Sequence, residues 1–555
     1  MTHDLIIRGG TVVDGSGAEG HVGDVVIDAG RVVAVVDHAD EAARDELEAE
    51  GRFVAPGFVD PHTHVDPQLW WDPFGLPLVL HGVTSVMTGN CSVTLAPCAE
   101  ADRDALARLF YQVEEVPLET LQAAVPWSWT DFGGYVDGLG GRLGINCATL
   151  VGHSAVRYAV MGEASLERTA TADEVARMRE VVRDSIRGGA IGFSTSQNKL
   201  HVGEGGVPIP SRWADLDEVV ALCEVLGEEG RGVIQTDGGV DVAHRADWVR
   251  EVGGPLAERT GRTVLAGNVL PAFRGSQEIL DVIGEFQERG GSIWAQAAPS
   301  RFDSYFTLDG GTVTFNVFPS WRAIGSMTHE ERLAAFRDPA MRDAIQRESV
   351  ESESAARWHR IRVAKATAER NRRFEGRTVT DLAVEDGVRV VDLIADLALD
   401  EDLQTQFVIE ANPKIDDAIG EFLRSPQALV GGSDAGAHVK TFCGGGNTSL
   451  MLSKWVRDLG VLTVEEAVRR MTSEPARALG FDGRGLLAPG FAADVVVFDL
   501  DRISYDVPRT VADLPGGAER LWHDATGVDH VLVNGHVAVR DGELTGALGG
   551  EVLRA

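Results

Sequence analysis

The feature that most constrains the fold is the alternation of short apolar runs with helical patterns through the middle of the chain. Eight of these runs are candidate strands, at residues 57–62, 83–91, 145–152, 190–195, 232–237, 263–268, 292–297 and 428–433. Strands that alternate with helices form parallel sheets, and eight such units close a barrel. The sequence therefore predicts an α/β fold built on a (β/α)8 barrel.

Two of the helices between these runs can be predicted in detail. Thr171 and Glu174 have the spacing of a capping box, and the apolar positions that follow recur every three or four residues until Gly188. A second helical pattern begins at Asp217 and stops at Gly230, where glycine can end a helix. Each helix leads directly into a predicted strand, as βα units require.

Both ends of the chain have a different sequence pattern, in which Gly and Asp residues separate short runs of β-forming residues. Such runs occur at residues 5–15, 24–28, 31–36, 493–499 and 528–536. Because isolated β-ribbons are only marginally stable, we predict that the two ends pair with each other. They would form one small β-sandwich domain from residues 1–56 and 484–555, with the barrel at 57–483.

A long interval separates the seventh and eighth predicted strands. Residues 300–425 contain charged helical stretches rather than another apolar run. We interpret this interval as a helical insertion at the barrel mouth, where lids and substrate walls are commonly found.

Charge and cysteine content exclude several classes of protein. The 51 basic and 85 acidic residues give a net charge of −34, whereas nucleic-acid binding needs a basic footprint. Five scattered cysteines do not resemble a disulfide framework or a zinc ribbon. No apolar run approaches the roughly 18 residues of a membrane span. We expect a soluble cytoplasmic homo-oligomer that binds neither nucleic acid nor membrane.

Polar residues with metal-binding chemistry stand at the ends of several predicted strands. His62 and His64 end the first strand, where side chains two residues apart face the same side. Alone, this pair would equally fit two hydrogen-bonded histidines at a strand end. Further candidates close other strands: Cys91 the second, His153 the third and Asp434 the eighth. Because the ends of barrel strands converge on one face, the pattern predicts a metal site there.

With these residues the chain resembles the amidohydrolase superfamily and, within it, the D-aminoacylase (N-acyl-D-amino-acid deacylase) group. The resemblance extends over nearly the whole length. It rests on PGFVDPHTH at 56–64, HGVTSVMTGNC at 81–91, GHSAVR at 152–157, GFST at 192–195, GSD at 432–434 and LAPGFAADV at 487–495.

The resemblance implies a barrel of the metal-dependent hydrolase type and a set of site residues. By it, a divalent metal, zinc before others, would be bound by His62, His64, Cys91 and Asp434. Asp434 would also act as general base and then acid, and His153 would donate to a developing oxyanion. The alternative for Cys91 is an inert buried thiol, and for His153 a structural histidine.

The chain departs from the family pattern at two strand ends. Where the family has histidines after strands five and six, this chain has Asp237 and Asn268. A carboxamide is a poor zinc ligand, so we expect one metal ion, with Asp237 and Asn268 turned to the substrate. Two further substrate-binding candidates are His201, on a Gly-rich loop, and Lys440, which replaces an expected carboxylate-binding arginine.

These observations predict a metal-dependent amidohydrolase that cleaves the C–N amide bond of an N-acyl amino acid or related small amide with an activated water. Two alternatives stay open. One is a cyclic amide or imide hydrolase of the same superfamily. The other is a catalytically silent barrel used for binding or assembly, which the missing histidines suggest.

Overall fold

The computed structural model describes residues 2–203, 206–238, 245–267, 275–309, 315, 318–325, 327–351, 358–412 and 415–555. The chain divides into two compact units. The first comprises residues 1–299, 417–439 and 443–555, and the second comprises 300–416 and 440–442.

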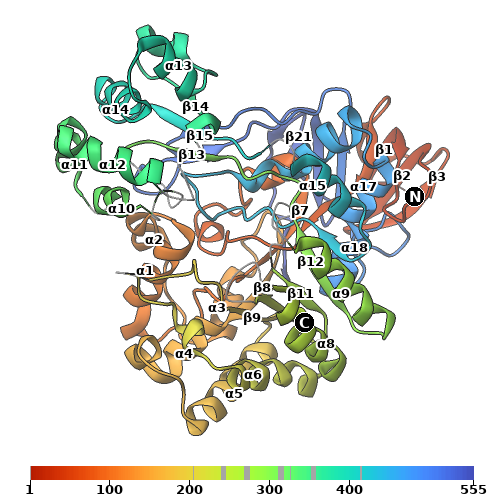
Figure 1. Cartoon of the computed structure of the whole chain (residues 1–555). Helices are drawn as coiled ribbons and strands as arrows, with labels where there is room; N and C mark the ends of the chain where they lie inside the picture. Colours follow the sequence, from red (N-terminus) through yellow and green to blue (C-terminus); the bar gives the residue numbers. More distant parts are fainter. Residues whose placement is uncertain are drawn as a thin grey trace. The chain divides into compact units, whose positions relative to one another are not determined.

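A parallel eight-stranded sheet forms the centre of the first unit (Figure 1). In spatial order its strands are β6 (Phe58–Asp60), β7 (Val83–Thr88), β8 (Asn146–Gly152), β9 (Gly192–Ser196), β10 (Val233–Asp237), β11 (Val264–Ala266), β12 (Ile293–Ala297) and β16 (Ala428–Val430). The chain after β16 then meets the chain after β6, because the Asp434 N–H donates to the His62 carbonyl at 3.0 Å. All eight predicted strands are present, which confirms the barrel.

The two ends of the chain build a second sheet of nine strands in the same unit (Figure 1). Eight of these strands are hydrogen-bonded in one continuous order, and the strand at residues 43–48 pairs with the first strand outside that order. The strands are β1 (His3–Val12), β2 (His21–Asp28), β3 (Arg31–Val36), β4 (Ala43–Glu48), β5 (Phe53–Pro56), β17 (Val495–Phe498), β20 (Val528–Val533), β21 (His536–Arg540) and β22 (Glu543–Leu544). The N-terminal and C-terminal parts join where β5 pairs antiparallel with β17. The predicted boundaries at 56 and 484 stay a prediction, since this sheet and the barrel belong to one unit.

A buried polar cluster connects the terminal sheet to the barrel. The Asp494 carboxylate accepts hydrogen bonds from Asn146 on β8 at 3.1 Å and from the Asn534 backbone N–H at 2.8 Å. It also contacts Arg484, which in turn pairs with Glu551. Just beyond Glu551, the short strand β23 (Val552–Leu553) pairs with β8 rather than with the terminal sheet. The last residues of the chain therefore pack on the barrel.

Helices α5 (Ala172–Arg187) and α6 (Leu216–Glu229) follow the sequence predictions closely. Thr171 caps α5 and Glu174 completes the capping box. Helix α6 begins at Leu216, slightly earlier than predicted, because the side chain of the preceding Asp215 caps it by accepting from the Glu218 N–H. Gly230 ends α6 in the left-handed conformation, with φ of 70°.

The remaining α-helices with residues in the first unit are shorter or less regular. They are α1 (Arg103–Glu114), α2 (Leu118–Ala124), α3 (Phe132–Leu139), α4 (His153–Met161), α7 (Arg245–Trp248), α8 (Gly254–Thr260), α9 (Ser276–Glu288), α15 (Ile415–Arg424), α16 (Asn447–Leu450), α17 (Val464–Met471) and α18 (Ser473–Leu479). A small hairpin pairs β18 (Arg509–Val511) with β19 (Arg520–Trp522).

Apart from residues 440–442, the second unit lies within the interval predicted as a helical insertion. Its helices are α10 (Pro319–Gly325), α11 (His329–Arg337), α12 (Pro339–Glu351), α13 (Val379–Asp386) and α14 (Val390–Asp400). The structure adds an antiparallel sheet that was not predicted, from β13 (Ser304–Phe306), β15 (Gln406–Ile409) and β14 (Ile361–Lys365). Phe306 and Phe407 from this sheet pack with Leu393 of α14, so the unit has its own core.

Among the described residues, none of the helices combines the length and the apolarity that crossing a membrane requires.

Candidate metal centre

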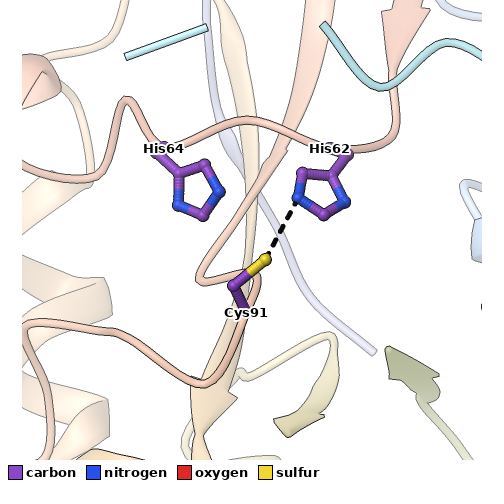
Figure 2. Close-up of side chains that lie close together, drawn as sticks. All are labelled: His62, His64 and Cys91. Carbon is purple, nitrogen blue, oxygen red and sulfur yellow. Dashed lines mark hydrogen bonds between the residues drawn. The ribbon is translucent and has the colours of Figure 1, made fainter. Parts of the chain in front are cut away.

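His62 and His64 lie just beyond the carboxyl end of β6, and each is only 1% exposed. Neighbouring strands hold this segment in place. The His64 N–H donates to the Ala435 carbonyl at 2.7 Å, and the Thr63 N–H donates to the Met87 carbonyl at 3.0 Å. The two imidazoles point toward the Cys91 thiol (Figure 2), and the ligand atoms of all three residues lie within 4.8 Å of one another.

The backbone around Cys91 is strained, and hydrogen bonds from other strands hold it there. Cys91 and Ser92 have φ of 54° and 70°, a left-handed conformation that costs a non-glycine residue about 1–3 kcal/mol. The Cys91 N–H donates to Gln235 of β10 at 3.0 Å, and the Ser92 N–H donates to Ser194 of β9 at 3.1 Å. This conformation puts the Cys91 sulfur 3.5 Å from His62 Nε2.

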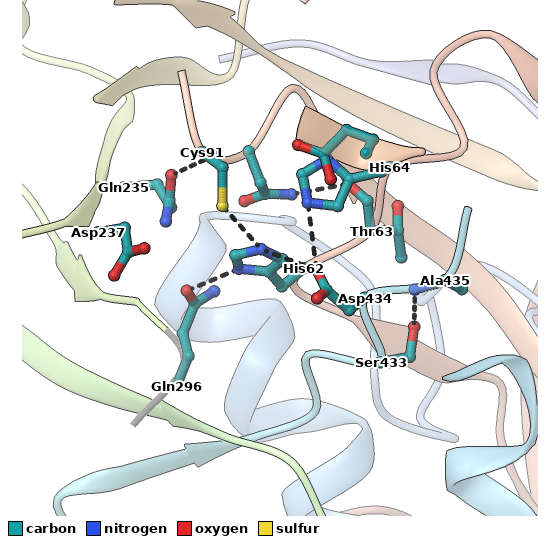
Figure 3. A network of polar contacts seen from close by, with 12 residues as sticks. His62, Thr63, His64, Cys91, Gln235, Asp237, Gln296, Ser433, Asp434 and Ala435 are labelled. Atoms are coloured by element: carbon teal, nitrogen blue, oxygen red, sulfur yellow. Dashed lines mark hydrogen bonds and ion pairs between the residues drawn. The ribbon is translucent and has the colours of Figure 1, made fainter. Parts of the chain in front are cut away.

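Asp434 adds an oxygen atom to the same group (Figure 3). Its Oδ1 lies 3.2 Å from His64 Nε2 and 3.5 Å from His62 Nε2. Asp434 is also left-handed, with φ of 59°, and its N–H is bound by the His62 carbonyl. The four residues that the family resemblance implied as metal ligands therefore converge at one place.

The hydrogen bonds of Gln296 orient the His62 ring. The Gln296 amide nitrogen donates to the Pro61 carbonyl at 3.0 Å, so its oxygen faces His62 Nδ1, also at 3.0 Å. His62 Nδ1 must then carry the proton, which leaves the Nε2 lone pair directed at Cys91 and Asp434. Sequence reasoning missed Gln296, although a polar residue near the end of a barrel strand was a usable signal.

Glu114, at the end of α1, is a second residue that the sequence did not suggest. Its Oε1 lies 3.4 Å from His64 Nδ1, on the ring edge opposite the one that faces Asp434. Burial raises the pKa of the Glu114 carboxyl well above its usual value; the charge of His438 opposes this effect and that of Asp434 adds to it. Helix α1 gave no sequence signal for this contact.

The electrostatics of the group favour a neutral imidazole beside an ionised carboxylate. Burial lowers the pKa of His64 to about 4, although Asp434 acts in the opposite direction. For Asp434, burial alone would raise the pKa, but the contact with His64 and the charges of the other histidines hold it below its usual value. Burial raises the pKa of the Cys91 thiol well above normal, and the carboxylates of Glu114 and Asp237 add to this effect.

The structure places His153 in a different, fully buried network. Its Nδ1 contacts the Thr195 hydroxyl at 2.9 Å and its Nε2 contacts Glu218 at 2.8 Å. Glu218 also pairs with Arg157 at 2.5 Å. Both ring nitrogens are therefore occupied by protein partners, and the predicted role of His153 as an oxyanion donor finds no support in this arrangement.

Asp237 lies near Cys91 (Figure 3). It anchors a set of polar contacts with other residues. Its Oδ1 accepts from Arg245 at 2.8 Å, and its Oδ2 accepts from Asn198 at 2.6 Å. His201 Nε2 is 3.9 Å from Oδ2, and its Nδ1 contacts the Ser196 hydroxyl at 2.7 Å. The two predicted substrate residues Asp237 and His201 are thus neighbours, and Arg245 is a partner that the sequence did not suggest.

The other two predicted substrate residues are not placed at the site. Lys440 is exposed and belongs to the second compact unit. Asn268 lies outside the described residues.

Comparisons with known proteins agree over most of the chain. The model described as "Amidohydrolase family" matches residues 45–539. D-aminoacylase of Alcaligenes xylosoxydans xylosoxydans is 29% identical over 563 residues, which cover 99% of this chain and 97% of the relative.

Two solved structures are similar over 100% of both chains, each with a TM-score of 0.67. One, at 26% identity, is a D-aminoacylase from work on the functional role of its binuclear metal centre, with one-metal activation and second-metal attenuation. The other, at 25% identity, is N-acyl-D-glutamate deacylase from Bordetella bronchiseptica, complexed with zinc and a phosphonate inhibitor that mimics the tetrahedral intermediate of the reaction.

Proposed function

The chain belongs to the amidohydrolase family, as an enzyme of its D-aminoacylase-like group, and we propose that it hydrolyses the C–N bond of N-acyl amino acids or related small amides. The observation that carries the proposal is the convergence of the buried residues His62, His64 and Cys91 with the partly exposed Asp434. Full-length similarity to D-aminoacylase supports the same reaction class.

The donor set fits a divalent metal, and we propose zinc. Two imidazole nitrogens, a sulfur and a carboxylate oxygen are the ligand types that zinc takes in proteins. His62, His64 and Cys91 already have their ligand atoms within 4.8 Å of one another, and a nearby cation favours the thiolate that burial otherwise disfavours. When bound, the metal would polarise an amide carbonyl and make water more acidic.

Asp434 is the proposed proton carrier of the reaction. Its contacts with the histidines keep the carboxylate ionised, so an Oδ atom can take a proton from the water that attacks the amide carbon. The same oxygen then gives the proton to the leaving nitrogen as the C–N bond breaks. The products are a carboxylic acid and a free amine, and Asp434 returns to its starting state.

We propose a single metal ion because the position beside Cys91 already holds an ion pair. Both carboxylate oxygens of Asp237 are bound, one by Arg245 and the other by Asn198. A guanidinium there repels a second cation and competes for the Asp237 ligand. The D-aminoacylase described by one-metal activation and second-metal attenuation is compatible with hydrolysis by one ion.

Asp237 and His201 are the proposed substrate-side residues, since both lie next to the metal group on the Cys91 side. Substrate contacts by Asn268 and Lys440 remain predictions from the sequence. Assembly as a homo-oligomer and a cytoplasmic location also remain predictions.

The proposal is tested by loading purified protein with zinc and measuring amine release from N-acyl-D-amino acids, N-acyl-L-amino acids and a cyclic amide. We expect hydrolysis of at least one N-acyl amino acid, and loss of that activity when a chelator removes the metal. Zinc-loaded protein that hydrolyses only the cyclic amide would support the cyclic amidase. Zinc-loaded protein that hydrolyses none of them would support a silent barrel.

A further inference from the structure

The two metal-site histidines differ in the group that faces their second ring nitrogen. His62 Nδ1 has the neutral Gln296 amide at 3.0 Å. His64 Nδ1 instead faces the carboxylate of Glu114, whose Oε1 is 3.4 Å away. Both atoms of this second contact are buried, and neither makes another hydrogen bond among the described residues.

Glu114 is placed on the side of His64 away from the metal group. Its carboxylate faces Nδ1, whereas Nε2 faces Asp434 at 3.2 Å on the other edge of the ring. Helix α1 ends at Glu114, and the Glu114 carbonyl accepts from the His438 N–H at 2.5 Å. The backbone that carries this carboxylate is therefore tied to the loop that follows Asp434.

A purely structural role explains the position of Glu114 poorly. Glu218, an equally buried carboxylate beside another histidine, has a 2.8 Å contact with His153 and an ion pair with Arg157. Glu114 is 3% exposed and has no comparable partner for its Oε1. Burial of a carboxylate is costly, and a divalent cation on the far edge of His64 would add to the compensating charge that His438 supplies.

We propose that Glu114 is a positioning residue of the metal site: its carboxylate accepts a hydrogen bond from His64 Nδ1–H and so fixes Nε2 as the ligand atom. The gap of 3.4 Å needs to shorten by only a few tenths of an ångström to reach ordinary hydrogen-bond length. A carboxylate behind a ligating imidazole also makes the ring a stronger donor to the metal. This inference rests on the proposed metal-dependent function.

The test compares zinc affinity in the wild type, Glu114→Gln and Glu114→Met, by competition with a chelator at fixed pH. Loss of such an outer contact weakens metal binding by about 10–100-fold, which is the loss expected for Glu114→Met. Glu114→Gln keeps an oxygen acceptor and should recover part of the affinity. The absorption spectrum of the cobalt-substituted protein should differ from that of the wild type more in Glu114→Met than in Glu114→Gln.

Glu218→Gln is the matched control, because it removes a buried carboxylate from a histidine outside the metal group. It should leave the zinc dissociation constant within about threefold of the wild type, a change of under 1 kcal/mol. Zinc binding by Glu114→Met within the same threefold limit would overturn the proposal. The proposal would also be overturned if Glu114→Gln and Glu114→Met lost zinc affinity equally and if the metal-free form of both variants unfolded at a lower temperature than the wild type.

The measurement separates this inference from the proposed function. Wild-type protein that binds zinc tightly but releases no amine would contradict the function, while the affinity ratios between variants would still decide the role of Glu114. Wild-type activity together with unchanged zinc affinity in Glu114→Met would contradict only the role of Glu114.

Discussion

Cys91 combines three properties that together favour a metal ligand over an inert core thiol. Its backbone is left-handed, its N–H is fixed by Gln235, and its sulfur lies 3.5 Å from His62 Nε2. A thiol that only fills space needs none of these constraints. Strained residues that several strands hold in place cluster at functional sites, and Asp434 has the same left-handed backbone.

At Asp434, replacement by Asn keeps the shape of the side chain but replaces the carboxylate with a neutral amide, which is too weak a base to take a proton from water. We expect kcat to fall by a factor of about 10² to 10⁴, the usual contribution of a general base. The measurement is amine release at saturating zinc, with circular dichroism to show that the variant is folded. A variant that keeps more than a tenth of the wild-type rate would remove Asp434 from the mechanism.

At Arg245, replacement by Met removes the positive charge that pairs with Asp237. The freed carboxylate should then attract a second zinc ion, so the second equivalent should bind at about tenfold lower zinc concentration than in the wild type. Equilibrium dialysis measures this. Arg250→Met, which removes an exposed arginine paired with Asp247, is the control and should match the wild type. Identical zinc-binding curves for wild type and Arg245→Met would contradict the proposal that Arg245 prevents a second metal ion from binding.

At the scale of single elements, the capping box of helix α5, which was predicted from the sequence, should stabilise the start of that helix. The Thr171 hydroxyl accepts from the Glu174 N–H at 3.3 Å, and Glu174 accepts from the Thr171 N–H at 2.8 Å. Thr171→Ala should destabilise the first turn by about 1 kcal/mol. Hydrogen exchange of the α5 amides should accelerate in this variant but not in Thr171→Ser, which keeps the hydroxyl.

The stability of the first turn of α5 should depend on pH through the ionisation of Glu174. The ion pair with Arg168 and the hydrogen bonds from Thr171 lower the pKa of Glu174 in the folded chain. Its stabilisation is therefore fully present above the unfolded pKa of about 4.3 and is lost as the pH falls toward the lower folded value. Exchange in the first turn of α5 should rise below pH 4, after correction for the intrinsic rate, and Glu174→Gln should lack this rise.

Much of the element order could be predicted from the sequence because each barrel strand is a short apolar run between turn residues. The sheet of the second unit was missed, since β14 and β15 lie among charged residues and their burial depends on tertiary contacts. The four residues of the metal group were predicted because they stand at strand ends. Glu114 reaches His64 from a helix, a contact that no local pattern encodes.

At the scale of the whole first unit, the Asp494 cluster joins segments from distant parts of the sequence. The carboxylate binds Asn146 of β8 and the backbone after β20, and Arg484 pairs with it. Asp494 belongs to the AAD segment that leads into β17, where sequence reasoning expected the chain to return to its β domain. The terminal sheet and the barrel should therefore depend on each other for stability.

Asp494→Ala should lower the unfolding temperature of the protein by several degrees. Removing one partner of a buried ion pair costs about 3–5 kcal/mol, because Arg484 and Asn146 lose their acceptor. Thermal unfolding followed by circular dichroism measures this, with the exposed Asp501→Ala as control. Zinc stoichiometry should stay unchanged, since the cluster does not touch the metal group. An unfolding temperature equal to that of the control would contradict the coupling.

At the scale of the reaction as a whole, we propose that one metal ion, held by His62, His64, Cys91 and Asp434, is sufficient for amide hydrolysis. The most direct test is a zinc titration of the metal-free protein, in which bound zinc and the rate of amine release are measured in the same samples. We expect the rate to rise in proportion to bound zinc and to reach its plateau at one ion per chain. A plateau that requires two ions, or one tightly bound ion without any amine release, would contradict it.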